Sequence, residues 1–321
     1  MVMRAVILDL KGLEALDLSA IEFLVDELVC YDLTAEDEIA HRIDGFDIVI
    51  TNKTPLSRHH LEHSAQLKLI CVLATGTNVV DKQAAYELGI PVSNCVAYGV
   101  DSVVQHVWSL ILALHTNLSS YTQDVAAGEW QRSEQFCFLT HPIIELKGRT
   151  LGIIGYGHLG QGVAKIAEAF GMKVIVCQKI GDMGHTQKDD NSKRPFDQFI
   201  QQADVISLHC PLTEATENLF TTEIFEQMKP EAFIINTARG GIVNEADLAD
   251  ALRRGIIAGA ACDVLTEEPP VKGNVLLDST IPNLLITPHT AWGSIEARNR
   301  IIEQTAENMR AFMSGTPIRT V

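Results

Sequence analysis

The sequence predicts an α/β protein with two domains, each built on a doubly wound parallel sheet. The chain has 321 residues, which suffices for two domains of roughly 150 residues each. Short apolar runs alternate with segments of helical apolar spacing, as in a parallel sheet whose helices cover both faces. A glycine-rich turn at 155–160 stands between an apolar run and a helical segment. Together these observations predict α/β architecture with a ligand site in the second half of the chain.

The first hundred residues contain one alternating series. Strands are predicted at 5–8, 46–50 and 67–73, and helices at 18–30, 34–43 and 81–88. A long apolar segment, 102–119, predicts a buried helix. Its apolar surface is broad, so we expect part of that surface to contact a second subunit. An irregular aromatic stretch containing Trp130, Phe136 and Phe138 follows.

The glycine turn opens a second series. After the predicted strand 151–154 and helix 161–170, the apolar runs predict strands at 173–177, 205–208, 233–236, 257–261 and 283–286. A last helix is predicted at 294–313. The polar patch 188–193 is interpreted as a surface loop.

Composition argues against several classes of function. The net charge of −16 disfavours nonspecific binding to nucleic acid or to an anionic membrane. The sequence shows neither a membrane-spanning apolar run nor a signal peptide at its start. Seven scattered cysteines without a CxxC pair are typical of a reducing compartment, so we expect a cytoplasmic protein. His59 and His63 lack a third ligand, and no metal site is expected.

The glycine turn has the spacing of a dinucleotide-binding fingerprint. Gly155, Gly157 and Gly160 follow an apolar run and precede a helix, which is the context that this fingerprint requires. The first glycine permits the tight turn, and the second lets the backbone approach a pyrophosphate. The third lets helix and strand pack closely, while the helix N-terminus faces the phosphates.

Polar residues follow three of the predicted strands in the second series. Arg239 follows 233–236, Asp263 and Glu268 follow 257–261, and His289 follows 283–286. Each taken alone is an ordinary surface or structural residue. Together, an Arg that binds a carboxylate and a His oriented by a carboxylate suit hydride transfer to a 2-oxo acid.

In these motifs the chain resembles the D-isomer-specific 2-hydroxyacid dehydrogenases over nearly its whole length. The shared motifs, in the family's order, are Gly155-x-Gly157-x-x-Gly160, Thr237-Ala238-Arg239-Gly240, Asp263 through Glu268-Pro269, and Thr287-Pro288-His289. Within the family the chain is most similar to the glycerate dehydrogenase (hydroxypyruvate reductase) subgroup. The segments that carry this similarity are Trp130-Gln131-Arg132-Ser133, Phe136-Cys137 and His289-Thr290-Ala291-Trp292.

The resemblance implies that Arg239, Glu268 and His289 are catalytic and that Asp263 contacts the nicotinamide carboxamide. It implies a loop at 73–78 in which Thr75 and Gly76 bind the substrate carboxylate, together with Arg239 and His289. The implied cofactor-binding residues are Gly155, Gly157, His158, Leu159, Gly160, Gln178, Lys179, Cys210, Pro211, Thr237, Ala238, Arg239, Asp263 and His289.

The resemblance also implies the domain organisation and the reaction. A Rossmann-type nucleotide domain at 99–288 would be inserted into a flavodoxin-like substrate domain at 1–98 and 289–321. The expected reaction reduces hydroxypyruvate or glyoxylate to D-glycerate or glycolate, and the expected assembly is a homodimer.

One position departs from the usual NAD-binding pattern. An acidic residue that binds the ribose diol is expected after strand 173–177, but Gln178 and Lys179 stand there. The absence of a carboxylate removes repulsion toward a 2′-phosphate, and Lys179 can add attraction. Alternatively, Gln178 hydrogen-bonds the diol and Lys179 is only solvated. We therefore expect NAD or NADP as cofactor, with NADPH accepted.

Two alternative functions remain open. One is a dinucleotide-sensing scaffold or corepressor on the same fold, which can keep the three catalytic residues. The other is a phosphoglycerate dehydrogenase lacking a regulatory domain, since the sequence ends at Val321. A formate dehydrogenase fits less well, because that subgroup has a glutamine where Glu268 stands.

Overall fold

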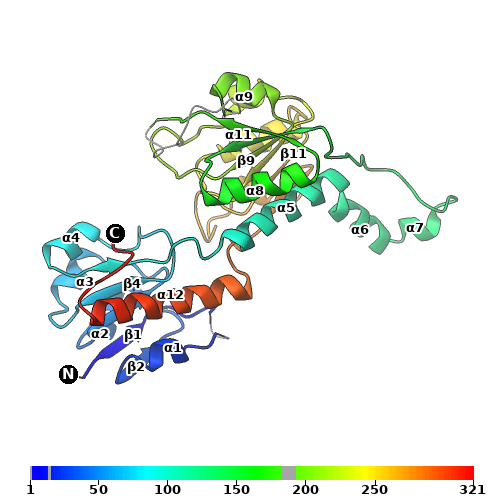
Figure 1. The fold of residues 1–321 in the computed structure, drawn as a ribbon. Coiled ribbons are helices and arrows are strands. Elements are labelled where there is room, and N and C mark those ends of the chain that lie inside the picture. Colours follow the sequence, from blue (N-terminus) through cyan, green and yellow to red (C-terminus); the bar gives the residue numbers. More distant parts are fainter. Residues whose placement is uncertain (1, 14–15, 182–192) are drawn as a thin grey trace. The chain divides into compact units, whose positions relative to one another are not determined.

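The computed structural model describes residues 2–13, 16–181 and 193–321. The chain divides into two compact units, Met1–Gly99 with Gly293–Val321, and Val100–Trp292 (Figure 1). The second unit is therefore inserted into the first along the sequence. Among the described residues, none of the helices is both long and apolar enough to cross a membrane.

The first unit contains a five-stranded parallel sheet in the order β2-β1-β3-β4-β5, which is the flavodoxin-like order. Its strands are β1 (Arg4–Ile7), β2 (Glu27–Cys30), β3 (Ile48–Thr51), β4 (Leu69–Val72) and β5 (Val92–Ser93). Its helices are α1 (Ser19–Glu22), η1 (Glu36–Glu38), α2 (Ile39–Ile43), α3 (Arg58–Glu62), α4 (Lys82–Glu87) and α12 (Ile295–Met313). Buried side chains of β1, β3 and β4 pack with those of α2, α3 and α4, and α12 packs against α1 and β4.

The prediction of a single helix over 18–30 is wrong. Helix α1 has only four residues, and Glu27–Cys30 forms the edge strand β2, in register with β1 from Arg4↔Glu27 to Ile7↔Cys30. The side chains of β2 are exposed or half-buried, so this strand lacks the apolar run of a central strand. It forms because β1 offers it backbone hydrogen-bonding partners.

The second unit contains a seven-stranded parallel sheet in the order β12-β11-β10-β9-β6-β7-β8. Its strands are β6 (Thr150–Ile154), β7 (Lys173–Cys177), β8 (Lys193–Arg194), β9 (Val205–Leu208), β10 (Phe233–Asn236), β11 (Gly259–Cys262) and β12 (Leu284–Ile286). This is the dinucleotide-binding order 3-2-1-4-5-6 with one further edge strand. The predicted α/β fold with two doubly wound sheets is therefore confirmed. Of the patch interpreted as a loop, residues 188–192 lie outside the described residues, and Lys193 begins β8.

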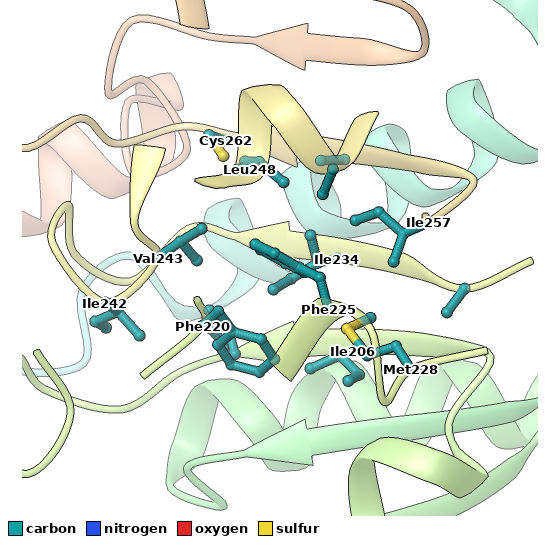
Figure 2. Close-up of a cluster of buried hydrophobic side chains, with 14 of the residues drawn as sticks. Ile206, Phe220, Phe225, Met228, Ile234, Ile242, Val243, Leu248, Ile257 and Cys262 are labelled. Atoms are coloured by element: carbon teal, nitrogen blue, oxygen red, sulfur yellow. The ribbon is translucent and has the colours of Figure 1, made fainter. Parts of the chain in front are cut away.

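Helices cover both faces of this sheet. On one face, α5 (Val100–Thr116) packs against β10 and α8 (His158–Ala169) packs against β6 and β7, and their buried side chains form one cluster with Phe233 and Ile235 of β10. On the other face, Ile234 packs with Phe225 and Leu248, from α10 (Thr222–Phe225) and α11 (Glu245–Arg253) (Figure 2). Helix α9 (Phe196–Gln202) lies on this second face too, and a 3-10 turn, η2 (Val275–Leu277), precedes β12.

The long apolar segment 102–119 is not one helix. Helix α5 ends at Thr116, because Asn117 is left-handed with φ of 49°, and α6 (Leu118–Ala126) follows. The apolar residues of α5 are buried in the core of their own unit. Exposed apolar side chains lie instead beyond α5, on α6, on α7 (Glu129–Arg132) and on the segment after it.

Candidate active site

The three glycines of the fingerprint lie in the turn between β6 and α8, and their surroundings differ. Gly155 has φ of 93°, and a Cβ there would come within 2.5 Å of the His209 carbonyl. A Cβ on Gly160 would overlap the carbonyl oxygen of Gly155. Around Gly157 nothing lies within 4 Å of the Cβ position. The first and third glycines are thus required by packing, and the second leaves a space that a dinucleotide phosphate can enter.

Helix α8 presents its N-terminus at this turn. Gly157 is the N-cap residue and has no side chain to accept a hydrogen bond from the first helical turn. His158 and Leu159 begin the helix, and His158 is exposed. Uncapped N–H groups and the positive end of the helix dipole favour an anion, so this turn fits the pyrophosphate of a dinucleotide.

The end of β7 carries a set of polar and basic residues. Gln178 and Lys179 follow this strand and are both exposed. The Gln178 N–H donates to the Arg194 carbonyl at 2.8 Å, and Arg194, the last residue of β8, pairs with Cys177 of β7. The structure therefore adds a guanidinium-bearing residue beside Gln178. Sequence reasoning missed Arg194 because no strand was predicted there.

Two buried polar atoms follow β9 and β10 without a hydrogen-bonding partner among the described residues. They are His209 Nδ1 and Thr237 Oγ1. Burial lowers the pKa of His209 to about 4, so its imidazole is neutral. Unsatisfied polar atoms at the carboxyl ends of the strands fit a ligand with hydrogen-bonding groups.

The neighbouring residues of the implied cofactor set are ordered by local hydrogen bonds. Cys210 is buried, and Pro211 accepts a hydrogen bond from Thr216 Oγ1 at 2.8 Å. Ala238 donates its N–H to the Asn236 side chain at 3.1 Å. Both turns therefore hold a defined backbone conformation at the edge of the sheet.

Arg239 lies in the turn after β10 and is exposed. Its Nη1 donates to the Ala238 carbonyl at 2.6 Å, and the structure shows no hydrogen bond from it to Glu268 or His289 within the described residues. The following residue, Gly240, packs directly on the backbone of Leu265 and Thr266, where a Cβ would overlap the Leu265 carbonyl. The Arg239 turn is thus packed against the loop that leads to Glu268.

Glu268 and His289 form a direct pair. Glu268 Oε2 lies 2.5 Å from His289 Nδ1, and Glu268 Oε1 accepts the Leu265 N–H at 2.7 Å. The His289 and Glu268 side chains are 35% and 32% exposed, so a ligand can reach them. Because Nδ1 is bonded to the carboxylate, Nε2 is the nitrogen that can exchange a proton with a ligand.

Asp263 holds the loop that carries His289. Its buried carboxylate accepts hydrogen bonds from the N–H groups of Thr290 and Ala291, both at 2.9 Å. Its Oδ1 also accepts a hydrogen bond from Thr287 Oγ1 at 2.5 Å. His289 itself is left-handed, with φ of 53°. Such strain in a non-glycine residue persists where surrounding bonds enforce it.

Thr75 and Gly76 lie in the first unit, in the loop after β4, and both are exposed. Thr75 Oγ1 donates to the Cys95 carbonyl at 2.9 Å, and Asn94 Nδ2 donates to the Thr75 carbonyl at 2.8 Å.

The two histidines considered as metal ligands also lie in the first unit, where His63 Nδ1 lies 2.6 Å from the His59 carbonyl. No group of three metal-ligating side chains occurs in the described part of the chain.

The sheet order, the glycine turn and the polar residues at the strand ends define a dinucleotide-binding oxidoreductase. Residues 108–291 match the NAD binding domain of the D-isomer specific 2-hydroxyacid dehydrogenases. The chain is 43% identical over 310 residues to the glycerate dehydrogenase of Methylorubrum extorquens, with 96% of each chain covered. It is 39% identical to the hydroxypyruvate reductase of Blautia hydrogenotrophica, over 98% of this chain and 95% of that one.

A solved acyclic imino acid reductase in complex with NADPH and D-Arg has a similar structure, with a TM-score of 0.83 and 28% identity. The similarity covers 99% of this chain and all of that one. The chain belongs to the D-isomer specific 2-hydroxyacid dehydrogenase family. It is thus an NAD(P)-dependent oxidoreductase whose substrates are small 2-oxo and 2-hydroxy acids.

Proposed function

We propose that this protein reduces hydroxypyruvate or glyoxylate to D-glycerate or glycolate, with NADH or NADPH as reductant. The observation that carries the proposal is the 2.5 Å contact between Glu268 and His289 at the carboxyl edge of the dinucleotide-binding sheet. The glycerate dehydrogenase and hydroxypyruvate reductase relatives support this substrate class. A cytoplasmic location is supported by seven free cysteines.

The catalytic roles follow from the side-chain chemistry. When bound, a dinucleotide would supply the hydride for C2 of the 2-oxo acid. His289 gives a proton from Nε2 to the carbonyl oxygen and takes it back in the reverse reaction, while Glu268 holds Nδ1 and stabilises the imidazolium. Arg239 offers its planar guanidinium to the substrate carboxylate and carbonyl. From the resemblance, the exposed Thr75 and Gly76 of the first unit remain proposed ligands of a substrate carboxylate through their N–H groups.

The dinucleotide would be held by the second unit. The pyrophosphate would be bound by the glycine turn, which contains Gly155, Gly157 and Gly160, and by the start of α8. The orphaned Thr237 hydroxyl would bond to the dinucleotide, and Asp263 keeps one carboxylate lone pair for the nicotinamide carboxamide. Gln178, Lys179 and Arg194 present no carboxylate to a 2′-phosphate, which supports acceptance of NADPH.

A steady-state panel tests the function. Hydroxypyruvate, glyoxylate, pyruvate and phosphohydroxypyruvate are each assayed with NADH and NADPH, beside the variant His289→Ala. We expect the highest kcat/KM with hydroxypyruvate or glyoxylate, and a loss of kcat of at least about 100-fold in His289→Ala with dinucleotide binding retained. Preference for phosphohydroxypyruvate would instead indicate a phosphoglycerate dehydrogenase. Dinucleotide binding without turnover of any substrate would indicate a sensor.

We also propose a homodimer built through α6, α7 and the segment that follows. The exposed apolar side chains there include Trp130, Phe136 and Leu139, which are 53%, 88% and 76% exposed. Such a concentration of apolar surface is typical of an interface. Light scattering should show a dimer at micromolar concentration, and Phe136→Ser with Leu139→Ser should weaken it. Val271→Ser, at a 77% exposed position elsewhere, is the matched control.

A further inference from the structure

A chain of polar contacts leads from helix α5 to the loop that carries His289. His106 Nε2, on α5, lies 3.0 Å from Thr287 Oγ1, and Thr287 Oγ1 donates to Asp263 Oδ1 at 2.5 Å. A threonine hydroxyl has a single proton to donate. Because that proton goes to Asp263, His106 Nε2 must be the donor in the first contact. His106 therefore donates to Thr287, and Thr287 donates to Asp263.

Asp263 in turn holds the loop that carries His289 by hydrogen bonds. Its carboxylate accepts the N–H groups of Thr290 and Ala291, and its backbone carbonyl accepts the His289 N–H at 2.8 Å. The Asp263 carboxylate is buried, whereas the His106 side chain is 21% exposed. His106 Nε2 also lies 3.5 Å from Asp263 Oδ1.

These hydrogen bonds surround His289, whose backbone conformation is unfavourable. The φ of 53° at His289 is uncommon for a residue with a side chain and must be maintained by its surroundings. The hydrogen bonds of the loop to Asp263 supply that support, and the Thr287 hydroxyl occupies one of the acceptor sites of the same carboxylate. Rotation of this hydroxyl away from Asp263 would leave the carboxylate with fewer donors.

We propose that His106 is a positioning residue for His289, because it fixes the Thr287 hydroxyl on Asp263 and so maintains the shape of the 287–291 loop. The proposal rests on the proposed function of His289. Among the described residues, His106 makes no hydrogen bond or ion pair with Glu268 or His289; its side-chain partners are Thr287 and Asp263. Thr287 donates to Asp263 Oδ1, whereas the oxygen with a spare lone pair for the nicotinamide carboxamide is Oδ2, so the effect is expected mainly on the protonation step and little on dinucleotide affinity.

Two substitutions of His106 distinguish the loss of its hydrogen-bond donor from the loss of its side-chain volume. His106→Leu removes the donor, whereas His106→Gln keeps an N–H donor of comparable reach. Gln105→Leu changes the preceding, exposed residue of α5 and is the matched control. The readouts are kcat, the Kd for NADH measured by fluorescence, and hydrogen exchange at the Thr290 and Ala291 amides in the protein without substrate.

We expect His106→Leu to lower kcat about tenfold and to speed exchange at both amides about tenfold, the scale of one lost hydrogen bond to a charged network. The Kd for NADH should stay within about twofold of the wild type, and His106→Gln should keep most of kcat. Thr287→Val interrupts the same chain and should reproduce the loss. Adding His106→Leu to Thr287→Val should cause little further loss, since the two residues act in series.

Wild-type kcat and exchange in both His106→Leu and Thr287→Val would overturn the proposal, and so would equal impairment by His106→Gln and His106→Leu. If His106→Leu does not fold, His106→Gln and Thr287→Val still carry the test. Failure of the proposed function looks different: the wild type would turn over none of the 2-oxo acids. The exchange measurement would still report whether His106 orders the loop.

Discussion

The α-carbon of Gly155 lies against the backbone of His209, and a Cβ there would come within 2.5 Å of the His209 carbonyl carbon and oxygen. The turn after β6 is thereby packed onto the end of β9, the neighbouring strand of the sheet. Two residues further on, Gly157 faces open space. The same motif thus contains one glycine required by the fold and one available to a ligand.

This contrast predicts opposite effects of alanine at the two positions. Gly157→Ala should leave the melting temperature nearly unchanged, because its φ of −81° suits alanine and nothing lies within 4 Å of the new Cβ. Its Kd for NADH should rise at least about tenfold, since the methyl group occupies the approach of the pyrophosphate. Gly155→Ala should instead lower stability by more than about 1–3 kcal/mol. Calorimetry and titration of both variants measure this, and unchanged NADH affinity in Gly157→Ala would place the phosphates elsewhere.

Replacing Glu268 by Gln should lower kcat for reduction. Glu268 Oε2 lies 2.5 Å from His289 Nδ1, and Glu268 Oε1 accepts the Leu265 N–H at 2.7 Å, so the carboxylate holds the imidazole ring. Glu268→Gln keeps the shape of the side chain but replaces a charge-assisted hydrogen bond by a neutral one, so kcat should fall about tenfold. The measurement is kcat with the preferred 2-oxo acid, beside the Kd for NADH, which should stay within about twofold of the wild type. Wild-type kcat in Glu268→Gln would show that a neutral hydrogen bond to the ring suffices.

Cofactor choice should respond to residue 178. Gln178→Asp introduces a bidentate acceptor for the ribose diol and repels a 2′-phosphate at close range. The ratio of kcat/KM for NADPH to that for NADH should fall at least about tenfold relative to the wild type. The companion variant Arg194→Gln should weaken NADPH use while sparing NADH. A wild type that already prefers NADH by about three orders of magnitude would show that other residues set the choice.

His209, whose ring nitrogen Nδ1 is buried, should make stability depend on pH below neutrality. Burial lowers its pKa from 6.5 to about 4, so the unfolded chain binds a proton at higher pH than the folded chain does. Its contribution is fully present above about pH 6.5 and is lost as the pH falls toward 4. In His209→Gln, which does not titrate, the free energy of unfolding should fall less between pH 7 and 5. The difference should be up to about 2 kcal/mol at pH 5. Parallel melting curves across this range would contradict the assignment.

The sequence by itself determined the class of fold and the strand ends at which the candidate site lies. Strands β7, β9 and β10 match the predicted ranges residue by residue. They are recognisable because central parallel strands are apolar on both faces and so appear as short apolar runs. The glycine turn was recognisable because its spacing and its flanking strand and helix are local features.

Only the tertiary structure decided what depends on distant partners. The edge strands β2 and β8 are short and incompletely buried, and each forms by hydrogen bonding to a neighbouring strand. In the site, tertiary structure joined Glu268 to His289 and made Asp263 the anchor of the loop. It also brought His106, from a helix far earlier in the chain, to Thr287. The physical reason is that apolar periodicity is encoded locally, whereas a hydrogen bond between residues 181 positions apart exists only after helix α5 and the loop that follows β12 have packed together within the second unit.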